Sequence, residues 1–213
     1  IESRGLGDVY KRQIRVRDAV LAHVASDAFW VNPWPASSHG ENKLHQLNLA
    51  YQSGLRLPQT MVTNDPGEVR ALFKRCEGRL IYKTLRPMGW QDHENERAVY
   101  TTSLEWDDLQ DDDALRLCPG IYQENIQKAF EVRANFMGNS VAAVAIDSQS
   151  RSETSQDWRF QNFMDEPLPL TPIDIPHAVH KACRQLMDKM GIVFGAFDFI
   201  VTPAGDWVFL EVN

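Results

Sequence analysis

Several features that would indicate a function directly are absent from this sequence of 213 residues. The longest apolar runs, such as VAAVAI, have only the length of strands, and no charged start precedes an apolar stretch, so we expect neither a membrane span nor a signal peptide. There is no phosphate-binding loop, no GxGxxG fingerprint and no nucleophile–base triad. Nucleotide binding therefore cannot be argued from a glycine-rich loop.

Cysteine and positive charge are also scarce. Cys76, Cys118 and Cys183 are far apart and in no metal-ligand spacing, which suits buried thiols in a reducing cytosol, so we expect a cytoplasmic protein. With 22 Lys and Arg against 29 Asp and Glu, the net charge of -7 argues against general nucleic-acid binding. Any polyanion must be held by locally gathered cations. A hydrophobic fraction of 43% is ordinary for one large or two small globular domains.

The two ends of the sequence are unusual. The segment IESRGLGDVYKRQ has little apolar periodicity, and we interpret residues 1–13 as a non-native or disordered tail; the alternative is a flexible basic N-terminal tail. The sequence stops at GDWVFLEVN, where Phe209 and Leu210 look like interior positions and nothing caps the strand. We therefore expect a fragment that was cut at both ends.

Apolar periodicity and turn residues predict a mixture of helices and strands. Helices are expected at 14–27, from the S-x-x-E capping box at Ser38 and Glu41 to Gly54, at 66–77 with Asp65 as its cap, and at 176–190, and 148–172 is expected to be mostly loop. The apolar faces expected for two of these helices are Leu44, Leu47 and Tyr51 in the second, and Val179, Cys183, Leu186, Met187 and Met190 in the last. Strands are expected at 79–85, 120–126, 131–137, 140–146, 192–201 and 207–213, with a hairpin across Gly138-Asn139. Because these elements do not alternate regularly, they favour an α+β fold.

The last two strands predict a cluster of oxygen ligands. If the turn centres on Ala204-Gly205, Thr202 faces Trp207 and Asp198 faces Glu211, with Cβ atoms roughly 4.5–5.5 Å apart. Asn213 lies two residues further along the same face. Two such carboxylates repel each other unless a cation lies between them or one is protonated, and oxygen-only ligands suit Mg²⁺. The alternative is a carboxylate pair on a solvent-facing sheet.

Four charged residues add to this cluster. Lys83 lies inside the apolar strand LIYKTL, either at a solvated edge or held for an anion. Lys43 occupies the first turn of its helix, where acidic residues are preferred. Arg133 shares a strand face with Glu131, and Arg159 follows in the polar loop as part of DWR. Each residue is unremarkable alone, but together they provide cations beside metal-type ligands.

Taken in order, these residues resemble the ATP-grasp superfamily, most of all its RimK-like branch and the microviridin-type ligases that cyclise ribosomal peptides. The resemblance covers about residues 28–213 and rests on ENKLHQLNLAYQSGLRLPQTMVTNDPGEV, PGIYQENIQKAFEVRANFMGNSVAAVAIDSQ, DWR and GAFDFIVTPAGDWVFLEVN. It implies two α+β subdomains with ATP between them. Residues 14–36 would be the remnant of an N-terminal subdomain and linker, 37–122 the first ATP-grasp subdomain, and 123–213 a truncated second one.

The resemblance also implies roles for individual residues. These are Lys43 and Lys83 for the ATP phosphates; Gln123, Glu124, Asn125 and Ile126 as a hinge that holds adenine; Glu131 for ribose; Arg133 and Arg159 as catalytic residues facing the phosphates; and Asp198, Glu211 and Asn213 for Mg²⁺. The implied partner is a precursor peptide whose leader docks on the hairpin 131–146, with apolar contacts from Phe136, Val141 and Val144. A homodimer is compatible with it.

The reaction implied is ATP-dependent ligation. A peptide carboxylate attacks the γ-phosphate, and a hydroxyl or amine then attacks the acyl phosphate to give an ester or an amide. Two alternatives stay open. One is a RimK-like ligase that adds amino acids to a protein or small molecule. The other is a peptide-binding module without turnover, although the presence of the phosphate and metal residues argues against it.

Overall fold

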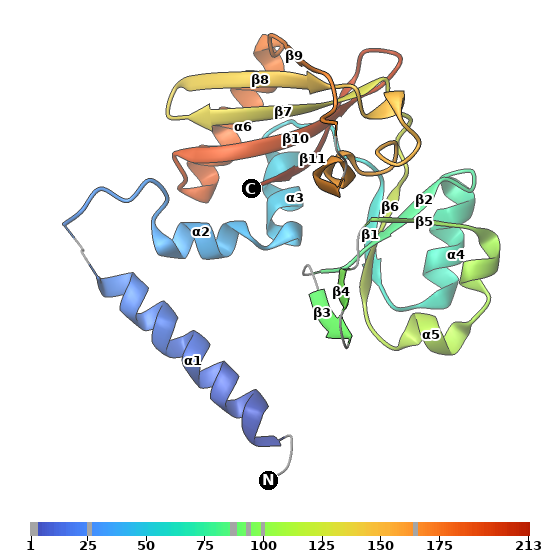
Figure 1. Cartoon of the computed structure of the whole chain (residues 1–213), viewed down its shortest axis with the longest axis horizontal. Coiled ribbons are helices and arrows are strands. Elements are labelled where there is room, and N and C mark those ends of the chain that lie inside the picture. The colour runs from blue at the N-terminus through green and yellow to red at the C-terminus, as the bar shows by residue number, and fades with distance from the viewer. Residues whose placement is uncertain (1–3, 25–26, 86–88, 93–94, 99–100, 164–165) are drawn as a thin grey trace.

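The chain folds into two antiparallel sheets with helices packed beside them, as Figure 1 shows for the computed structural model. The structure describes residues 4–24, 27–85, 89–92, 95–98, 101–163 and 166–213. The helices are α1 (Arg4–His23), α2 (Trp34–Gly40), α3 (Lys43–Gln52), α4 (Pro66–Arg75), α5 (Asp112–Arg116) and α6 (His177–Met190). The strands are β1 (Thr60–Thr63), β2 (Leu80–Lys83), β3 (Gly89–Asp92), β4 (Asn95–Ala98), β5 (Thr102–Leu104), β6 (Gly120–Glu124), β7 (Phe130–Met137), β8 (Ser140–Ile146), β9 (Leu170–Pro172), β10 (Phe194–Val201) and β11 (Trp207–Val212).

The larger sheet has the strand order β11-β10-β7-β8-β9, and α3 and α6 pack beside it. Its helix-facing side carries large apolar residues, among them Phe136, Phe197, Phe199 and Phe209, all fully buried. Since alternate residues of a strand point to opposite faces, the residues between them point to the other side of the sheet. That other side carries the polar residues of the candidate site.

The smaller sheet has the order β1-β6-β2-β5, and α4 packs beside it. The N-terminal cap of α4 is the one predicted, because the Asp65 carboxylate accepts a hydrogen bond from the Glu68 backbone N–H and Pro66 occupies the first turn. Helix α4 contributes Val69 and Leu72 to a second apolar cluster with Tyr122. A separate hairpin, β3-β4, completes the sheets among the described residues.

The helix expected from residue 38 to 54 is wrong in its start and its buried face. Two helices occupy this region, and Asn42 caps the second by accepting hydrogen bonds from the backbone N–H groups of Leu44 and His45. The break resets the helical phase, so Gln46 and Ala50 are buried while Tyr51 is 75% exposed. The Ser38–Glu41 pattern is no cap, since α2 already spans residue 38.

The first helix also differs from expectation. It begins at Arg4 rather than near residue 14, so the described part of the expected tail is helical; residues 1–3 lie outside the described residues. Once a helical turn exists, backbone hydrogen bonds can extend it through residues that have no buried face. Apolar periodicity does not detect such an extension. The helix points away from the sheets in Figure 1, and Val9 and Val16 on it are exposed. No described helix is long and apolar enough to cross a membrane.

The expected division at residues 122 and 123 falls inside β6, which pairs with β1 and β2. Helix α3 was assigned to the first subdomain, but it packs against α6 and β11 of the larger sheet. Chain order could not indicate this packing, because the contacts join residues far apart in the sequence. We keep the two-subdomain division as a proposal, with α3 lying beside the larger sheet.

Candidate functional site

The site is built on a row of residues that crosses the larger sheet. Arg133 of β7 is the register partner of Asp198 of β10, which is in turn the partner of Glu211 of β11. The prediction that the two carboxylates face each other is confirmed. The prediction for the turn is wrong, because Val201, not Thr202, pairs with Trp207. The register shifts between residues 198 and 199, and this bulge restores the predicted pairing at the carboxylates.

The two carboxylates converge on the side-chain amide of Asn213. Its Nδ2 lies 3.3 Å from Asp198 Oδ2 and 3.4 Å from Glu211 Oε1. Arg133 Nη1 donates to both Asp198 oxygens, at 2.9 and 2.8 Å. Burial and the nearby Glu211 raise the pKa of Asp198 and Arg133 lowers it, with a net pKa of about 6. An oxygen-rich point where a donor group already sits between two carboxylates is a suitable position for a hard cation.

Within the described ranges, no three His, Cys, Asp or Glu side chains gather as a metal site. The candidate metal ligands are two carboxylates and one amide, so the set depends on Asn213. Such a set leaves coordination positions open, as Mg²⁺ sites that also bind phosphate oxygens do. The donor set therefore fits Mg²⁺ shared with a phosphorylated ligand.

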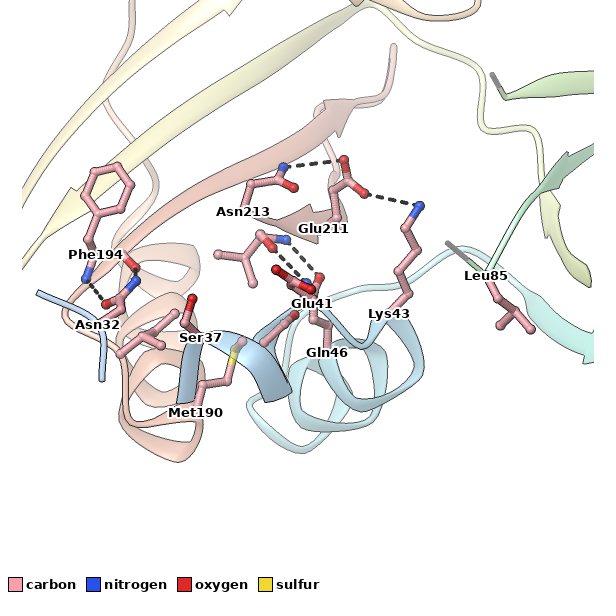
Figure 2. A pocket seen from close by; sticks show the side chains of 13 residues that line it. Asn32, Ser37, Glu41, Lys43, Gln46, Leu85, Met190, Phe194, Glu211 and Asn213 are labelled. Atoms are coloured by element: carbon pink, nitrogen blue, oxygen red, sulfur yellow. Dashed lines mark hydrogen bonds and ion pairs between the residues drawn. The ribbon is translucent and has the colours of Figure 1, made fainter. Parts of the chain in front are cut away.

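Glu211 is surrounded by cations. Lys43 Nζ lies 3.7 Å from one of its carboxylate oxygens, and Arg159 Nη1 lies 3.2 Å from the other (Figure 2 shows the Lys43 contact). Burial alone would raise the pKa of Glu211, but Lys43, Arg159 and Lys83 outweigh it and hold the pKa below its ordinary value. Three of the four predicted cations, Lys43, Lys83 and Arg159, thus gather around one carboxylate, and the fourth, Arg133, binds Asp198.

Lys83 is not at a sheet edge, since β2 lies between β6 and β5. Its Nζ donates a hydrogen bond of 2.8 Å to Gln123 Oε1, and Gln123 Nε2 donates to Thr60 Oγ1. Burial, together with Lys43 and Arg159, lowers the pKa of Lys83 and Glu211 opposes this, with a net pKa of about 8. The position of β2 argues against the sheet-edge interpretation of Lys83, and its role in holding an anion stays a prediction.

Asp157 is a site residue that the sequence analysis missed. It is buried, and its two oxygens accept hydrogen bonds from Arg159 Nε at 2.9 Å and Nη2 at 2.8 Å. This two-point pairing aims the remaining guanidinium nitrogen at Glu211. The acid two residues before the arginine in DWR was the available signal.

Lys128 was missed as well. Its Nζ donates to Glu131 Oε1 at 3.0 Å and to the Gln156 backbone oxygen at 2.8 Å, and the Lys128 and Glu131 side chains are only 7% and 6% exposed. Burial raises the pKa of Glu131, although Lys128 opposes this. A buried lysine therefore joins the candidate ribose ligand to the loop that carries Asp157 and Arg159.

Two cavities lie beside these residues. A cavity of about 50 Å³ lies between the sheets and is lined by Lys83, Gln123, Glu124, Asn125, Ile126, Lys128, Glu131, Asp157, Arg159 and Asp198, among others. Lys83, the 123–126 segment and Asp198, which the resemblance assigns to one nucleotide site, thus line a single cavity. A second cavity, of about 880 Å³, was not predicted; it is lined by Lys43, Glu211 and Asn213 on one side and Met190 and Phe194 on the other (Figure 2).

The hinge segment is already partly hydrogen-bonded within the protein. The backbone N–H groups of Glu124 and Asn125 donate to the carbonyls of Gln59 and Arg79. These two donors are therefore engaged, and a ligand on the hinge would use the other backbone groups of residues 123–126. The segment joins the smaller sheet to the loop before β7, so it lies between the two sheets.

The predicted apolar contacts of the 131–146 hairpin are partly wrong. Phe136 is the register partner of Val141, and both face the core beneath the sheet. Val144 is the partner of Arg133 and therefore faces the polar side. The prediction treated the three residues as one surface, whereas strand alternation places only Val144 on the side of the site.

We expect Lys128→Met to destabilise the protein in a pH-dependent way. Without the lysine, Glu131 is a buried carboxylate with no cation, which should lower the free energy of unfolding by about 1–3 kcal/mol at pH 7. The loss should shrink towards pH 5, because the raised pKa lets Glu131 become neutral. Urea unfolding at both pH values measures this. The double variant Lys128→Met/Glu131→Gln should recover stability at pH 7, and equal losses at both pH values would contradict the expectation.

No family model matches the chain, and no curated protein matches it. Solved structures do. A RiPP-associated ATP-grasp ligase from Chryseobacterium gregarium, in complex with ADP and a leader and core peptide, is 26% identical with a TM-score of 0.86. The macrocyclase MdnC from Microcystis aeruginosa, bound with precursor peptide MdnA, is 30% identical with a TM-score of 0.84, and MdnB from the same organism is 28% identical with a TM-score of 0.75.

The alignments cover 100% of this chain and 63%, 65% and 64% of those three proteins, respectively. The chain thus spans less than two thirds of the length of the proteins it resembles.

Proposed function

Because this chain has the ATP-grasp fold and resembles the peptide macrocyclases, we propose that it is the nucleotide-binding part of an ATP-dependent ligase that matures a ribosomal peptide. One observation carries the proposal: Lys43, Lys83 and Arg159 surround Glu211 beside the facing carboxylate Asp198. The three cations come from separate segments of the chain, and none of them is offered as a covalent nucleophile. A phosphate with its metal is the ligand that such an arrangement suits.

ATP would lie along the smaller cavity. Residues 123–126 would hold adenine, Glu131 would meet the ribose hydroxyls, and Lys83 and Lys43 would meet the phosphates. This cavity of about 50 Å³ is below the roughly 300 Å³ at which ligand pockets begin, so the sheets must move apart to admit a nucleotide. The contact between Arg159 and Glu211 is exposed, so a phosphate could replace Glu211 as the partner of Arg159 when the sheets move apart.

Asp198, Glu211 and Asn213 would hold Mg²⁺, which supplies charge neutralisation at the transferred phosphoryl group. Arg133 holds Asp198 by two hydrogen bonds and so fixes the direction of its oxygens. Arg159, kept in place by Asp157, would face the phosphates and the acyl phosphate formed from the peptide carboxylate. These residues bind and neutralise charge, which is how phosphoryl transfer is accelerated.

The peptide would approach from the larger cavity. That cavity is lined by Lys43 and by two of the candidate metal ligands, Glu211 and Asn213, and its volume of about 880 Å³ accommodates several side chains. The C. gregarium ligase and MdnC were solved with precursor peptides, and this supports a precursor as the partner. We place its leader on the hairpin 131–146 through Val144 and the polar face, and we propose a homodimer. Cys76 and Cys183 are buried as expected, whereas Cys118 is exposed; three free cysteines suit the reducing cytosol, where we propose that the protein works.

Proton uptake on nucleotide binding tests the phosphate role of Lys83. With its pKa at about 8, half of the Lys83 side chains are neutral at pH 8, and a bound phosphate favours the charged form. Binding of ADP with Mg²⁺ should therefore take up about half a proton at pH 8 and almost none at pH 6.5. Calorimetry in buffers of different ionisation enthalpy measures this uptake.

Lys83→Arg is the control, because arginine stays charged and should bind without this uptake. Binding with no proton uptake in the original chain would remove Lys83 from the phosphate site. Absence of ADP binding altogether would contradict the proposed function.

A further inference from the structure

Gln46 is a buried polar residue for which the proposed reaction has no role. It lies on α3, one turn after Lys43, and is 4% exposed. Its carboxamide pairs twice with the backbone of Val212: Nε2 donates to the Val212 carbonyl at 2.7 Å, and the Val212 N–H donates to Oε1 at 3.0 Å. The second amide hydrogen is used as well, because Nε2 also donates to the Gly40 carbonyl at the end of α2. Figure 2 shows Gln46 directed at this part of β11.

This pairing completes the open edge of β11. Asn213 exchanges both backbone hydrogen bonds with Ala196, at 2.9 and 2.8 Å, so it points towards β10. Val212 points its backbone groups to the opposite edge, where a bridge joins Val208 to Arg56 but no strand of the described residues pairs with β11. A carboxamide has the same donor and acceptor as a peptide group, so Gln46 provides the two hydrogen bonds that another strand would provide.

Val212 lies between two candidate metal ligands. Glu211 and Asn213 flank it in the sequence and point to the polar face, while the Val212 side chain is buried in the core. Fixing the Val212 backbone therefore fixes the base of both ligands. The same helix brings Lys43 to 3.7 Å from Glu211, so one turn of α3 carries both the backbone clamp and the cation.

We propose that Gln46 is a positioning residue that holds Glu211 and Asn213 in place as ligands for the cation of the nucleotide site. This rests on the proposed function. Gln46 does not touch the ligand; it acts through the backbone of the strand between the two ligands. An edge strand that lacks these hydrogen bonds frays at its end, and frayed ligands bind a cation more weakly.

The test compares Gln46→Leu with Gln52→Leu in the full chain. Gln52 is the same residue type on the same helix, but it is exposed and bonds only to Asn48 in the described part of the chain. In Gln46→Leu, amide hydrogen exchange at Val212, followed by NMR without ligand, should be at least about tenfold faster. The Phe209 amide, which donates to the Arg56 carbonyl, should change less than about twofold and serves as the internal reference.

The second measurement is binding of Mn²⁺ in the presence of ADP, followed by electron paramagnetic resonance. Gln46→Leu should weaken Mn²⁺ affinity by about tenfold, the lower end for residues that orient metal ligands, and Gln52→Leu should not change it. Combining Gln46→Leu with Glu211→Gln should add less than the sum of the two single losses, because both act on one ligand.

Each outcome is decisive. Unchanged exchange at Val212 would overturn the clamp whatever the function is. Faster exchange with unchanged Mn²⁺ affinity would reduce Gln46 to a structural residue and overturn its positioning role. If the original chain binds no Mn²⁺ with ADP, the proposed function fails and the positioning role fails with it, whereas faster exchange would still establish the hydrogen bonds.

Discussion

Lys83→Ala is expected to abolish ATP-dependent turnover while leaving peptide affinity nearly unchanged. The lysine would donate a charge-assisted hydrogen bond to a phosphate, worth about 1.5–3 kcal/mol. Its loss also leaves transition-state charge without a partner, so the rate of peptide dehydration should fall by roughly 10² or more. The peptide would bind on the hairpin 131–146, on a different sheet from β2. Turnover and peptide binding should therefore separate.

Mass-detected loss of water from the peptide measures turnover in a protein that carries this core, and calorimetry measures peptide affinity. Lys189→Ala is the matched control, because Lys189 is exposed at the end of α6, and it should match the original protein in both measurements. Near-original dehydration in Lys83→Ala would remove Lys83 from the site, and with it the ATP-grasp assignment of β2. A parallel loss of peptide affinity would place the peptide against β2 instead.

Phe197→Ala is expected to cause a large loss of stability. Phe197 is 0% exposed and packs against Phe136, Phe199 and Phe209, with ring centroids 5.0, 6.3 and 6.1 Å from its own. Removing it takes away buried apolar surface and leaves a cavity between β10 and the helices, which should lower the free energy of unfolding by about 3–5 kcal/mol. Denaturant unfolding followed by circular dichroism measures the change.

Phe29→Ala is the control for this core variant. Phe29 is 84% exposed, so its removal should change the free energy of unfolding by less than about 0.5 kcal/mol.

Asp198 follows Phe197 directly and points to the opposite face. Loss of the core residue should therefore also weaken ADP binding near the unfolding transition. A stability loss below about 1 kcal/mol in Phe197→Ala would show that the apolar cluster around Phe197 is not a closely packed core.

Local patterns in the sequence were sufficient for much of the fold. The hairpin of β7 and β8, the cap at Asp65 and the buried face of α6 depend on neighbouring residues, and all three are as predicted. The two-residue period also placed Glu131 with Arg133, and Asp198 with Glu211, on one face of the sheet. The assignment of roles came from the resemblance, because no short motif in the chain carries them.

Local patterns failed where two alternatives were similar in sequence but differed in packing. Ser38 and Glu41 looked like a cap, yet Asn42 caps α3, because the break between α2 and α3 is set by what each helix packs against. The pairing of Asp198 with Glu211 depends on a bulge that a simple count across the turn does not contain. The count gave the right partner at that position and the wrong one beside the turn.

By itself, the sequence determined which residue types were available to the site and which strand faces carried them, because those properties follow from chain-local geometry. Only the tertiary structure decided what each charge meets. It brought Lys43 and Arg159 to Glu211, and Gln46 to the backbone of Val212. Gln46 and Val212 are 166 positions apart, a separation over which periodicity carries no information, so packing of the whole chain alone brings them into contact.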